Sequence, residues 1–243
     1  MKKPILLSAP MLLACALVHA ENPPTSPFTA NLSLTSNYKF RGQDQGNNKP
    51  ALQGGFDYAK DGFYIGNWNS SIGFTDAGIE MDFYAGYKGV VSEALGYDVG
   101  ILQYYYPQKN RPVDFNTTEL YGALSSGPAT LKYSHTVSKD YFGFGGGVAR
   151  GRNTGYLDLA VNYEIVPGLT FNGHAGYTRF SSDLRDNVDL PNYYDYKAGV
   201  TYDLSKFVGS GVSISGAIVG ASEKGFYGDV NKARFIATLT KAL

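Results

Sequence analysis

Apolar and polar side chains alternate along most of this chain, from Phe28 to the C-terminus. Between Ile79 and Lys88, the odd positions are apolar or aromatic, while the even positions include two carboxylates and a lysine. A period of two places successive side chains on opposite faces of a β-strand. Two architectures suit many such strands: a soluble sandwich or small barrel with a dry core, and a membrane barrel with an apolar outside and a polar interior.

The alternation predicts an all-β chain of about twelve antiparallel strands with no helix between them. Most of the expected strands are close to the roughly 9–11 residues that cross a bilayer with tilt. Their expected ranges are 28–38, 51–59, 63–72, 79–88, 97–106, 117–125, 130–137, 154–163, 169–178, 193–202, 211–221 and 232–243.

Long and short connections alternate between these strands, as in 39–50 followed by 60–62, and 138–153 followed by 164–168. Long connections at one rim and short turns at the other are typical of outer-membrane barrels. A soluble sandwich has no reason to sort its connections in this way. An even number of strands also returns both termini to the short-turn side, which is the periplasm in such barrels.

The first residues resemble a bacterial export signal. Lys2 and Lys3 precede an apolar stretch from Ile5 to Val18, and Val18-His19-Ala20 fits a cleavage site. We therefore expect residues 1–20 to be a signal peptide and residues 21–243 to be an outer-membrane β-barrel. The sole cysteine, Cys15, lies in the signal segment, so the mature chain is expected to hold no disulfide.

Composition excludes several functions. Without Lys2 and Lys3 the chain has 19 basic and 21 acidic residues, which argues against nucleic-acid binding. The mature chain has two histidines, His135 and His174, neither in a His-x-Ser pattern, and it has no Gly-x-Ser-x-Gly motif. We therefore expect no enzymatic activity, no metal site and no cofactor.

The polar face of the predicted strands carries charges of both signs, which would be costly in a dry core. They indicate a hydrated lumen, although the solvent face of a sandwich is an alternative. Twelve strands would leave a narrow pore, and the mixture of signs suggests little charge selectivity. The candidate lining or rim residues are Arg41, Glu80, Asp82, Lys88, Asp98, Glu119, Lys132, Asp195 and Lys197.

Aromatic residues gather near the strand ends, where they predict girdles at the two membrane interfaces. Alternatively, Tyr and Phe are simply favoured in strands. The aromatic residues concerned are Tyr38, Phe40, Phe63, Tyr64, Tyr104, Tyr105, Tyr106, Tyr141, Phe142, Tyr193 and Tyr194. Cations are expected on the long-loop rim, where they could contact lipopolysaccharide phosphates or anionic solutes: Lys39, Arg41, Lys49, Lys109, Arg111, Arg150 and Arg152.

Several short motifs resemble those of the TorF-like porins, a proteobacterial family also catalogued as being of unknown function. The segment 36–42 (SNYKFRG) is similar to the family's opening motif, Ser-x-Tyr-x-Phe-Arg-Gly. Further similar segments follow in order, at 50–58 (PALQGGFDY), 62–68 (GFYIGNW), 80–87 (EMDFYAGY), 104–107 (YYYP), 118–121 (TELY) and 140–142 (DYF). The resemblance covers most of the mature chain and is strongest before about residue 145. It implies an outer-membrane barrel with a transport role, but no settled substrate and no catalytic residues.

The sequence thus predicts a bacterial outer-membrane channel for passive diffusion of small hydrophilic solutes. The alternative is a closed structural or adhesive barrel that acts through its extracellular loops. Expected partners are outer-membrane lipid, lipopolysaccharide, small-molecule solutes and the barrel-assembly machinery. Phe235, Leu239 and Leu243 share one parity at the C-terminus, so we expect that machinery to recognise the chain although its last residue is not aromatic.

Overall fold

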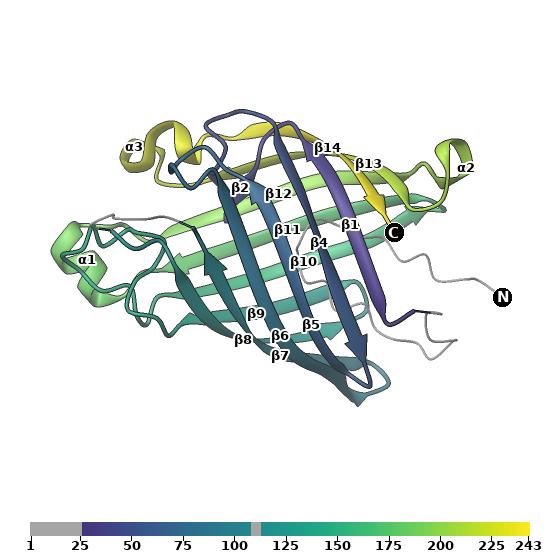
Figure 1. Cartoon of the computed structure of the whole chain (residues 1–243), viewed down its shortest axis with the longest axis horizontal. Helices are drawn as coiled ribbons and strands as arrows, with labels where there is room; N and C mark the ends of the chain where they lie inside the picture. The colour runs from purple at the N-terminus through teal and green to yellow at the C-terminus, as the bar shows by residue number, and fades with distance from the viewer. Residues whose placement is uncertain (1–25, 108–112) are drawn as a thin grey trace.

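The computed structural model describes residues 26–107 and 113–243. The expected signal peptide therefore lies outside the described residues. In the described chain, twelve strands form a closed antiparallel barrel, seen from the side in Figure 1. They are β1 (Phe28–Thr35), β4 (Ala51–Lys60), β5 (Phe63–Ser71), β6 (Ile79–Ser92), β7 (Leu95–Tyr105), β8 (Thr117–Ser126), β9 (Ala129–Thr136), β10 (Gly155–Val166), β11 (Leu169–Arg179), β12 (Tyr193–Asp203), β13 (Val212–Ala221) and β14 (Arg234–Ala242).

Each barrel strand pairs with its neighbours in chain order, and β1 closes the ring by pairing with both β4 and β14. At the closure, Leu34 lies opposite Leu52 on one side and Leu239 on the other. A closed barrel leaves no strand edge unpaired, so the wall's backbone polar groups are satisfied without water. The predicted fold class and strand count are confirmed.

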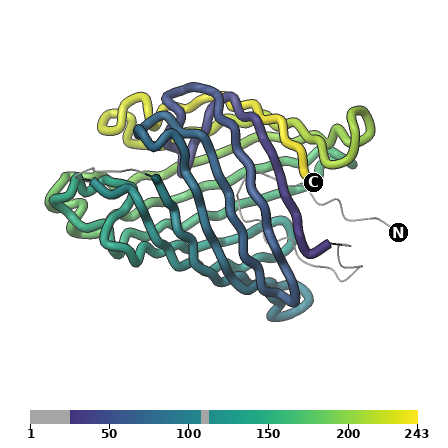
Figure 2. The backbone as a smooth tube through the Cα atoms, in the orientation of Figure 1, coloured from purple at the N-terminus to yellow at the C-terminus, as the bar shows by residue number. Residues whose placement is uncertain are grey.

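The two ends of the barrel differ, and the continuous wall between them is visible in Figure 2. The short-turn end holds the turns 61–62, 93–94, 127–128 and 167–168, and the connection 204–211. The long-loop end holds loop 1 (36–50), loop 2 (72–78), loop 3 (106–116), loop 4 (137–154), loop 5 (180–192) and loop 6 (222–233). The turn expected over 89–96 is shorter because β6 and β7 extend to Ser92 and Leu95, with a register shift between Val90 and Ser92.

The prediction that no helix interrupts the strands is wrong in the connections. These contain α1 (Ser182–Val188), α2 (Ser205–Val208), α3 (Lys224–Tyr227) and the 3-10 helix η1 (Gly228–Asn231). The N-cap of α1 is Ser181, whose hydroxyl accepts a hydrogen bond from the Leu184 amide at 3.2 Å. Leu184 is fully buried against Phe180 and Tyr141, so α1 closes over part of the long-loop end. In the described ranges, no helix is long and apolar enough to cross a membrane.

The barrel is apolar outside and polar inside. Large apolar side chains cover the outer wall, as shown by Leu32 (52% exposed), Leu120 (48%) and Ile214 (45%). The lumen-facing carboxylates of Glu80 and Glu119 are each 1% exposed. A soluble sandwich would bury the first set and expose the second. The arrangement therefore matches a barrel surrounded by hydrocarbon.

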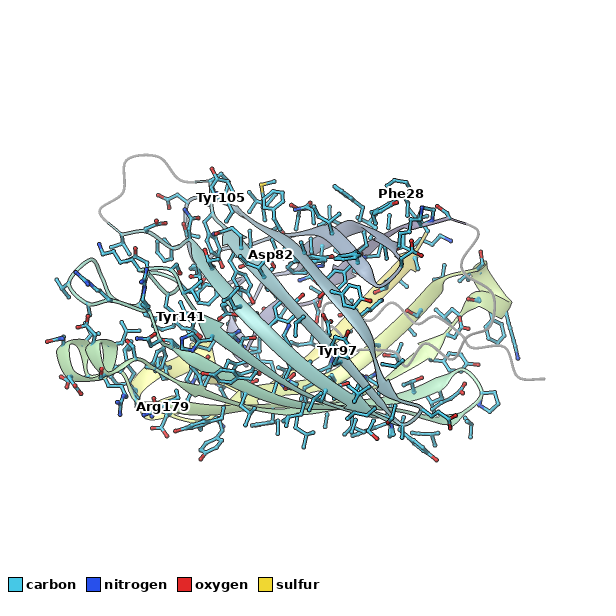
Figure 3. All side chains as sticks on the ribbon, turned by 90° about the horizontal axis from the view of Figure 1, so that it is seen from below. Phe28, Asp82, Tyr97, Tyr105, Tyr141 and Arg179 are labelled. Carbon is cyan, nitrogen blue, oxygen red and sulfur yellow. The ribbon has the colours of Figure 1, made fainter. Side chains whose placement is uncertain are left out.

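The predicted aromatic girdles are wrong for most of the residues assigned to them. Phe63, Tyr105 and Tyr194 are exposed on the outer wall, and Figure 3 shows Tyr105 outside the barrel and Tyr141 within its outline. The remaining aromatic residues face the interior: Tyr38, Phe40, Tyr64, Tyr104, Tyr106, Tyr141, Phe142 and Tyr193. Neighbours at a strand end point alternately out and in, so an aromatic cluster there divides between lipid and lumen.

Inward tyrosines lie over glycines of neighbouring strands. A Cβ on Gly100 of β7 would collide with the Tyr121 hydroxyl and would lie 2.6 Å from the Ala85 carbonyl oxygen. We expect Gly100→Ala to destabilise the barrel by about 1–3 kcal/mol, because the backbone carbonyl cannot move aside. Gly122→Ala on β8 is the matched control, since its Cβ would meet only Val99 Cγ1 at 4.0 Å. Urea unfolding in lipid vesicles measures both, and equal midpoints for the two variants would contradict the expectation.

Candidate functional site: the barrel lumen and loop 1

Loop 1 turns into the barrel instead of continuing β1. The first strand was expected to run to Tyr38, but it ends at Thr35. The loop then forms a small hairpin of β2 (Lys39–Phe40) and β3 (Gln43–Asp44), which the sequence did not predict. Its tip is Arg41-Gly42, with φ of +47° and +75°. A Cβ on Gly42 would lie 2.6 Å from Asp195 Cβ and 2.7 Å from the Gly220 carbonyl oxygen, so the tip touches the β12–β13 wall.

Arg41 holds this tip in place across the lumen. Its Nη1 and Nη2 donate to Oε1 and Oε2 of Glu119 on β8, at 2.9 and 2.7 Å. Nη1 also donates to the Tyr141 hydroxyl of loop 4 at 2.8 Å, and the guanidinium lies 4.1 Å from the centroid of the Tyr156 ring. Bidentate arginine–carboxylate pairs are strong and geometrically specific. The tip of loop 1 is therefore fixed to strands β8 and β10 and to loop 4.

A second anchor lies at the start of loop 1. The Tyr38 hydroxyl donates to Glu80 Oε1 at 2.6 Å, and the Tyr106 hydroxyl donates to Glu80 Oε2 at 2.5 Å. The Tyr38 ring packs edge-to-face on Trp68, with 5.5 Å between the ring centroids. Glu80, which is completely buried from solvent on β6, thus has a donor for each carboxylate oxygen.

The outer part of loop 1 is bonded to other loops. Asn47 Nδ2 donates to the Gly73 carbonyl oxygen of loop 2, and Gln43 Nε2 donates to Asn231 Oδ1 of loop 6 at 3.0 Å. Lys39 Nζ donates to the Val230 carbonyl oxygen, also of loop 6, at 2.8 Å. Burial lowers the pKa of Lys39 to about 8. Loops 2, 4 and 6 therefore all hold loop 1 in its inward position.

Aromatic packing fills the long-loop half of the lumen. Phe40 of loop 1 contacts both Tyr104 and Phe142, with ring centroids 5.4 Å apart in each pair. Phe74 and Phe115 extend this cluster to loops 2 and 3. Edge-to-face pairs of this kind add to the free energy gained from burial. Loop 1 is thus a packed constriction, held by hydrogen bonds and aromatic contacts to the barrel wall and to the other loops.

A cavity of about 210 Å³ lies beneath loop 1. It is bounded by loop 1 residues Lys39 to Gly42 and by wall residues as close to the short-turn end as Thr130 on β9. Its charged lining on the strands comprises Asp82, Lys132, Asp158, His174 and Lys197. A single water needs only about 10–15 Å³ of such volume, so the cavity has room for a small solute with several waters.

The structure brings some of the predicted lining residues together and separates others. Arg41, which was also expected on the rim, lies inside the lumen as the partner of Glu119. Glu80, Asp82, Asp98, Glu119 and Asp195 are buried on the inner wall, and Lys132 and Lys197 line the cavity. Lys88 is exposed near the short-turn end, although Asp98 is its register partner. Asp98 instead accepts a hydrogen bond from Tyr64 at 2.5 Å.

Other residues of the site were not among the predicted lining residues. Tyr38, Tyr141 and Tyr156 hold the loop and its arginine, while His174 joins Asp158 and Asp195 at 2.9 and 3.5 Å. Inward parity could have identified Tyr156, but nothing in the pattern indicates that loop 1 folds inward. The predicted rim cations Lys109 and Arg111 lie outside the described residues. In the part of the chain that the structure describes, no group of three His, Cys, Asp or Glu side chains could hold a metal ion.

Comparison with known proteins agrees with this geometry. The profile of a family described as "Bacterial protein of unknown function (Gcw_chp)" matches residues 20–242. A search of curated proteins found no match. Among solved structures, the KdgM porin is similar with a TM-score of 0.58 and 9% identity, over 88% of this chain and 98% of that one. The NanC porin is similar with a TM-score of 0.55 and 10% identity, over 88% and 98%. At these identities the likeness shows a shared fold.

Proposed function

We propose that this chain, which belongs to the Gcw_chp family of bacterial proteins of unknown function, is an outer-membrane channel for passive diffusion of small hydrophilic solutes. The observation that carries the proposal is a cavity of about 210 Å³, lined by charged, polar and apolar side chains, inside a closed barrel with an apolar outer wall. In this proposal loop 1 is the constriction that limits solute size. Passive diffusion needs no cofactor and no catalysis, so we propose that the protein is not an enzyme.

Three observations support a channel. The barrel shares its fold with the KdgM and NanC porins, and one KdgM porin structure is described as a complex with disordered oligogalacturonate. The motif at 36–42 resembles the TorF-like porins, and its Arg41 is the residue that positions the constriction. Twelve strands lie between the small barrels filled by side chains and the 16–18 strands that give a wide aqueous channel.

The proposed orientation follows from the two ends. The long-loop end faces the outside, where lipopolysaccharide would meet its loops, and the short-turn end faces the periplasm. The apolar outer wall contacts outer-membrane lipid. Export by the expected signal peptide and insertion by the barrel-assembly machinery belong to the same proposal.

Reconstitution tests the channel. Purified protein in planar bilayers is expected to show discrete, small conductance steps, because loop 1 narrows the path without filling the cavity beneath it. Vesicles that contain the protein should swell in small sugars and not in large oligosaccharides. Heat-denatured protein that has lost its compact gel mobility is the control. Electrical silence together with no swelling in any solute would contradict the proposal.

A closed structural or adhesive barrel is the second candidate. It is favoured by the buried Arg41–Glu119 pair and the aromatic cluster, which pack the long-loop half of the lumen. The same bilayers separate the two functions. Silent wild-type protein that binds a surface or partner through its loops would favour the closed barrel, while wild-type conductance steps would favour the channel.

A further inference from the structure

Lys197 is a cation inside the barrel that has no hydrogen-bond or ion-pair partner among the described residues. It lies on β12, directly opposite His174 of β11, and its side chain lines the cavity. It makes no hydrogen bond or ion pair with any residue in 26–107 or 113–243. A largely buried ammonium without a counter-charge is costly, and an anion with its hydration water in the cavity would offset that cost.

Lys132 is a second cation on the same side of the cavity. It lies on β9, and its Nζ is 4.0 Å from the centroid of the Tyr121 ring. The described residues offer it no carboxylate at ion-pair distance. Its register partner Asp158 is engaged instead by His174 Nδ1 at 2.9 Å. The cation–π contact leaves the ammonium group able to accept an anionic ligand.

The carboxylates around these lysines already have donors. Arg41 pairs with Glu119, Tyr64 donates to Asp98, and Tyr156 donates to Asp195 at 3.1 Å. Asp195 Oδ2 has no hydrogen-bond partner in the described structure, and neither has Oδ1 of Asp82 on β6. Of these two carboxylates, Asp82 lines the cavity and Asp195 does not. An anion is therefore favoured on the β9–β12 side of the cavity and disfavoured beside β6.

We infer that the β9–β12 side of the cavity is a binding site for small carboxylate anions, with Lys132 and Lys197 as their counter-charges. Ser134 and Ser215 also line the cavity, and their hydroxyls are neutral hydrogen-bond donors to which a carboxylate could bind. This inference gives the channel of the proposed function a preference for anions. The balanced count of lumen charges had suggested little selectivity, but the count ignores which charges are already paired.

Trp68 allows the site to be tested without any current. It is the sole tryptophan of the chain and it lines the same cavity. Iodide and acrylamide quenching of its fluorescence would be measured on detergent-folded protein at constant ionic strength. The variants are Lys132→Gln/Lys197→Gln and, as matched control, Lys88→Gln, whose lysine lies outside the cavity.

We expect the double variant to lower the iodide quenching constant about fivefold, because cations that line a cavity raise the local concentration of anions inside it. Acrylamide quenching should be the same in all three proteins, and sodium acetate should protect Trp68 from iodide in wild type and in Lys88→Gln. Equal iodide quenching in wild type and the double variant would overturn the inference. So would acetate that gives no more protection than chloride.

Bilayer recordings keep this inference separate from the channel itself. If the channel is open, the wild-type reversal potential in a salt gradient should have the sign that indicates anion selectivity. In the double variant, this reversal potential should be closer to zero. Currents, together with iodide quenching that is the same in the double variant as in wild type, would overturn the anion site but not the channel. Silent bilayers, together with iodide quenching that depends on the two lysines and is reduced by acetate, would overturn the channel but not the anion site.

Discussion

Replacement of Arg41 by glutamine is expected to release loop 1 and to raise the single-channel conductance several-fold. The change removes both hydrogen bonds to Glu119 and the bond to Tyr141. It also leaves the Glu119 carboxylate, which is 1% exposed, without its counter-charge. Breaking one partner of a buried ion pair costs about 3–5 kcal/mol. Outward movement of loop 1 would hydrate Glu119 and avoid that cost.

The measurement is single-channel conductance in planar bilayers. Lys49→Gln is the matched control, because this substitution also removes one positive charge from loop 1, but at an exposed position. The double variant Arg41→Gln/Glu119→Gln should recover part of the wild-type constriction, since no buried charge is then left unpaired. A conductance of Arg41→Gln equal to that of Lys49→Gln would show that the Arg41–Glu119 pair does not hold the constriction.

The same variant is informative if the wild-type barrel is closed. Arg41→Gln would then turn silent bilayers into conducting ones, because the cavity beneath loop 1 already reaches residues near the short-turn end. A barrel in which wild type and variant are both silent would be sealed by more than loop 1. The aromatic contacts of Phe40 with Tyr104 and Phe142 would be the next contacts to remove.

The wall of the barrel was predictable because the alternation of inward and outward side chains is a property of neighbouring residues in the sequence. One residue in two faces lipid, so the sequence from Ile79 to Lys88 is enough to place Glu80 and Asp82 inside. The alternation of long and short connections then distinguishes the two ends. The strand ends follow the alternation less closely: β6 and β7 run further than expected because a bulge lets the alternation shift near Val90.

The constriction was not predictable from those local rules. Arg41 and Glu119 are 78 positions apart, and nothing in the alternation relates a loop residue to a wall residue on the far side of a barrel. Arg41 therefore resembled any rim cation. The aromatic residues Tyr38 and Tyr106 misled for a related reason, because an interface ring and a lumen-packing ring occupy the same strand ends. Their inward parity was the available signal.

The pairing of lumen charges could not be predicted from the composition or from the strand register either. Lys88 and Asp98 are register partners, yet Tyr64 takes the carboxylate and Lys88 is exposed. Lys132 and Asp158 are register partners too, yet His174 takes that carboxylate. Register fixes which Cα atoms face each other, whereas long side chains reach diagonal partners. Only the three-dimensional arrangement shows which lysines are left without a partner.

Replacement of Leu159 by arginine is expected to destabilise the folded barrel by about 2–4 kcal/mol, which is the cost of an arginine on the lipid face near the bilayer midplane. Leu159 lies within β10 and is 48% exposed on the outer wall. Val166→Arg is the matched control, because Val166 is the last residue of the same strand and lies at the short-turn end. Its arginine should cost about 0–1 kcal/mol, since it reaches the interface.

Guanidinium unfolding in lipid vesicles measures both variants against wild type. A large difference between them requires that the apolar outer wall lies in hydrocarbon and that β10 crosses it. Parallel measurements in detergent should reduce the difference, because a micelle adapts its shape around an arginine more readily than a bilayer does. Equal destabilisation of Leu159→Arg and Val166→Arg in vesicles would contradict a transmembrane β10, and with it the bilayer orientation on which the channel depends.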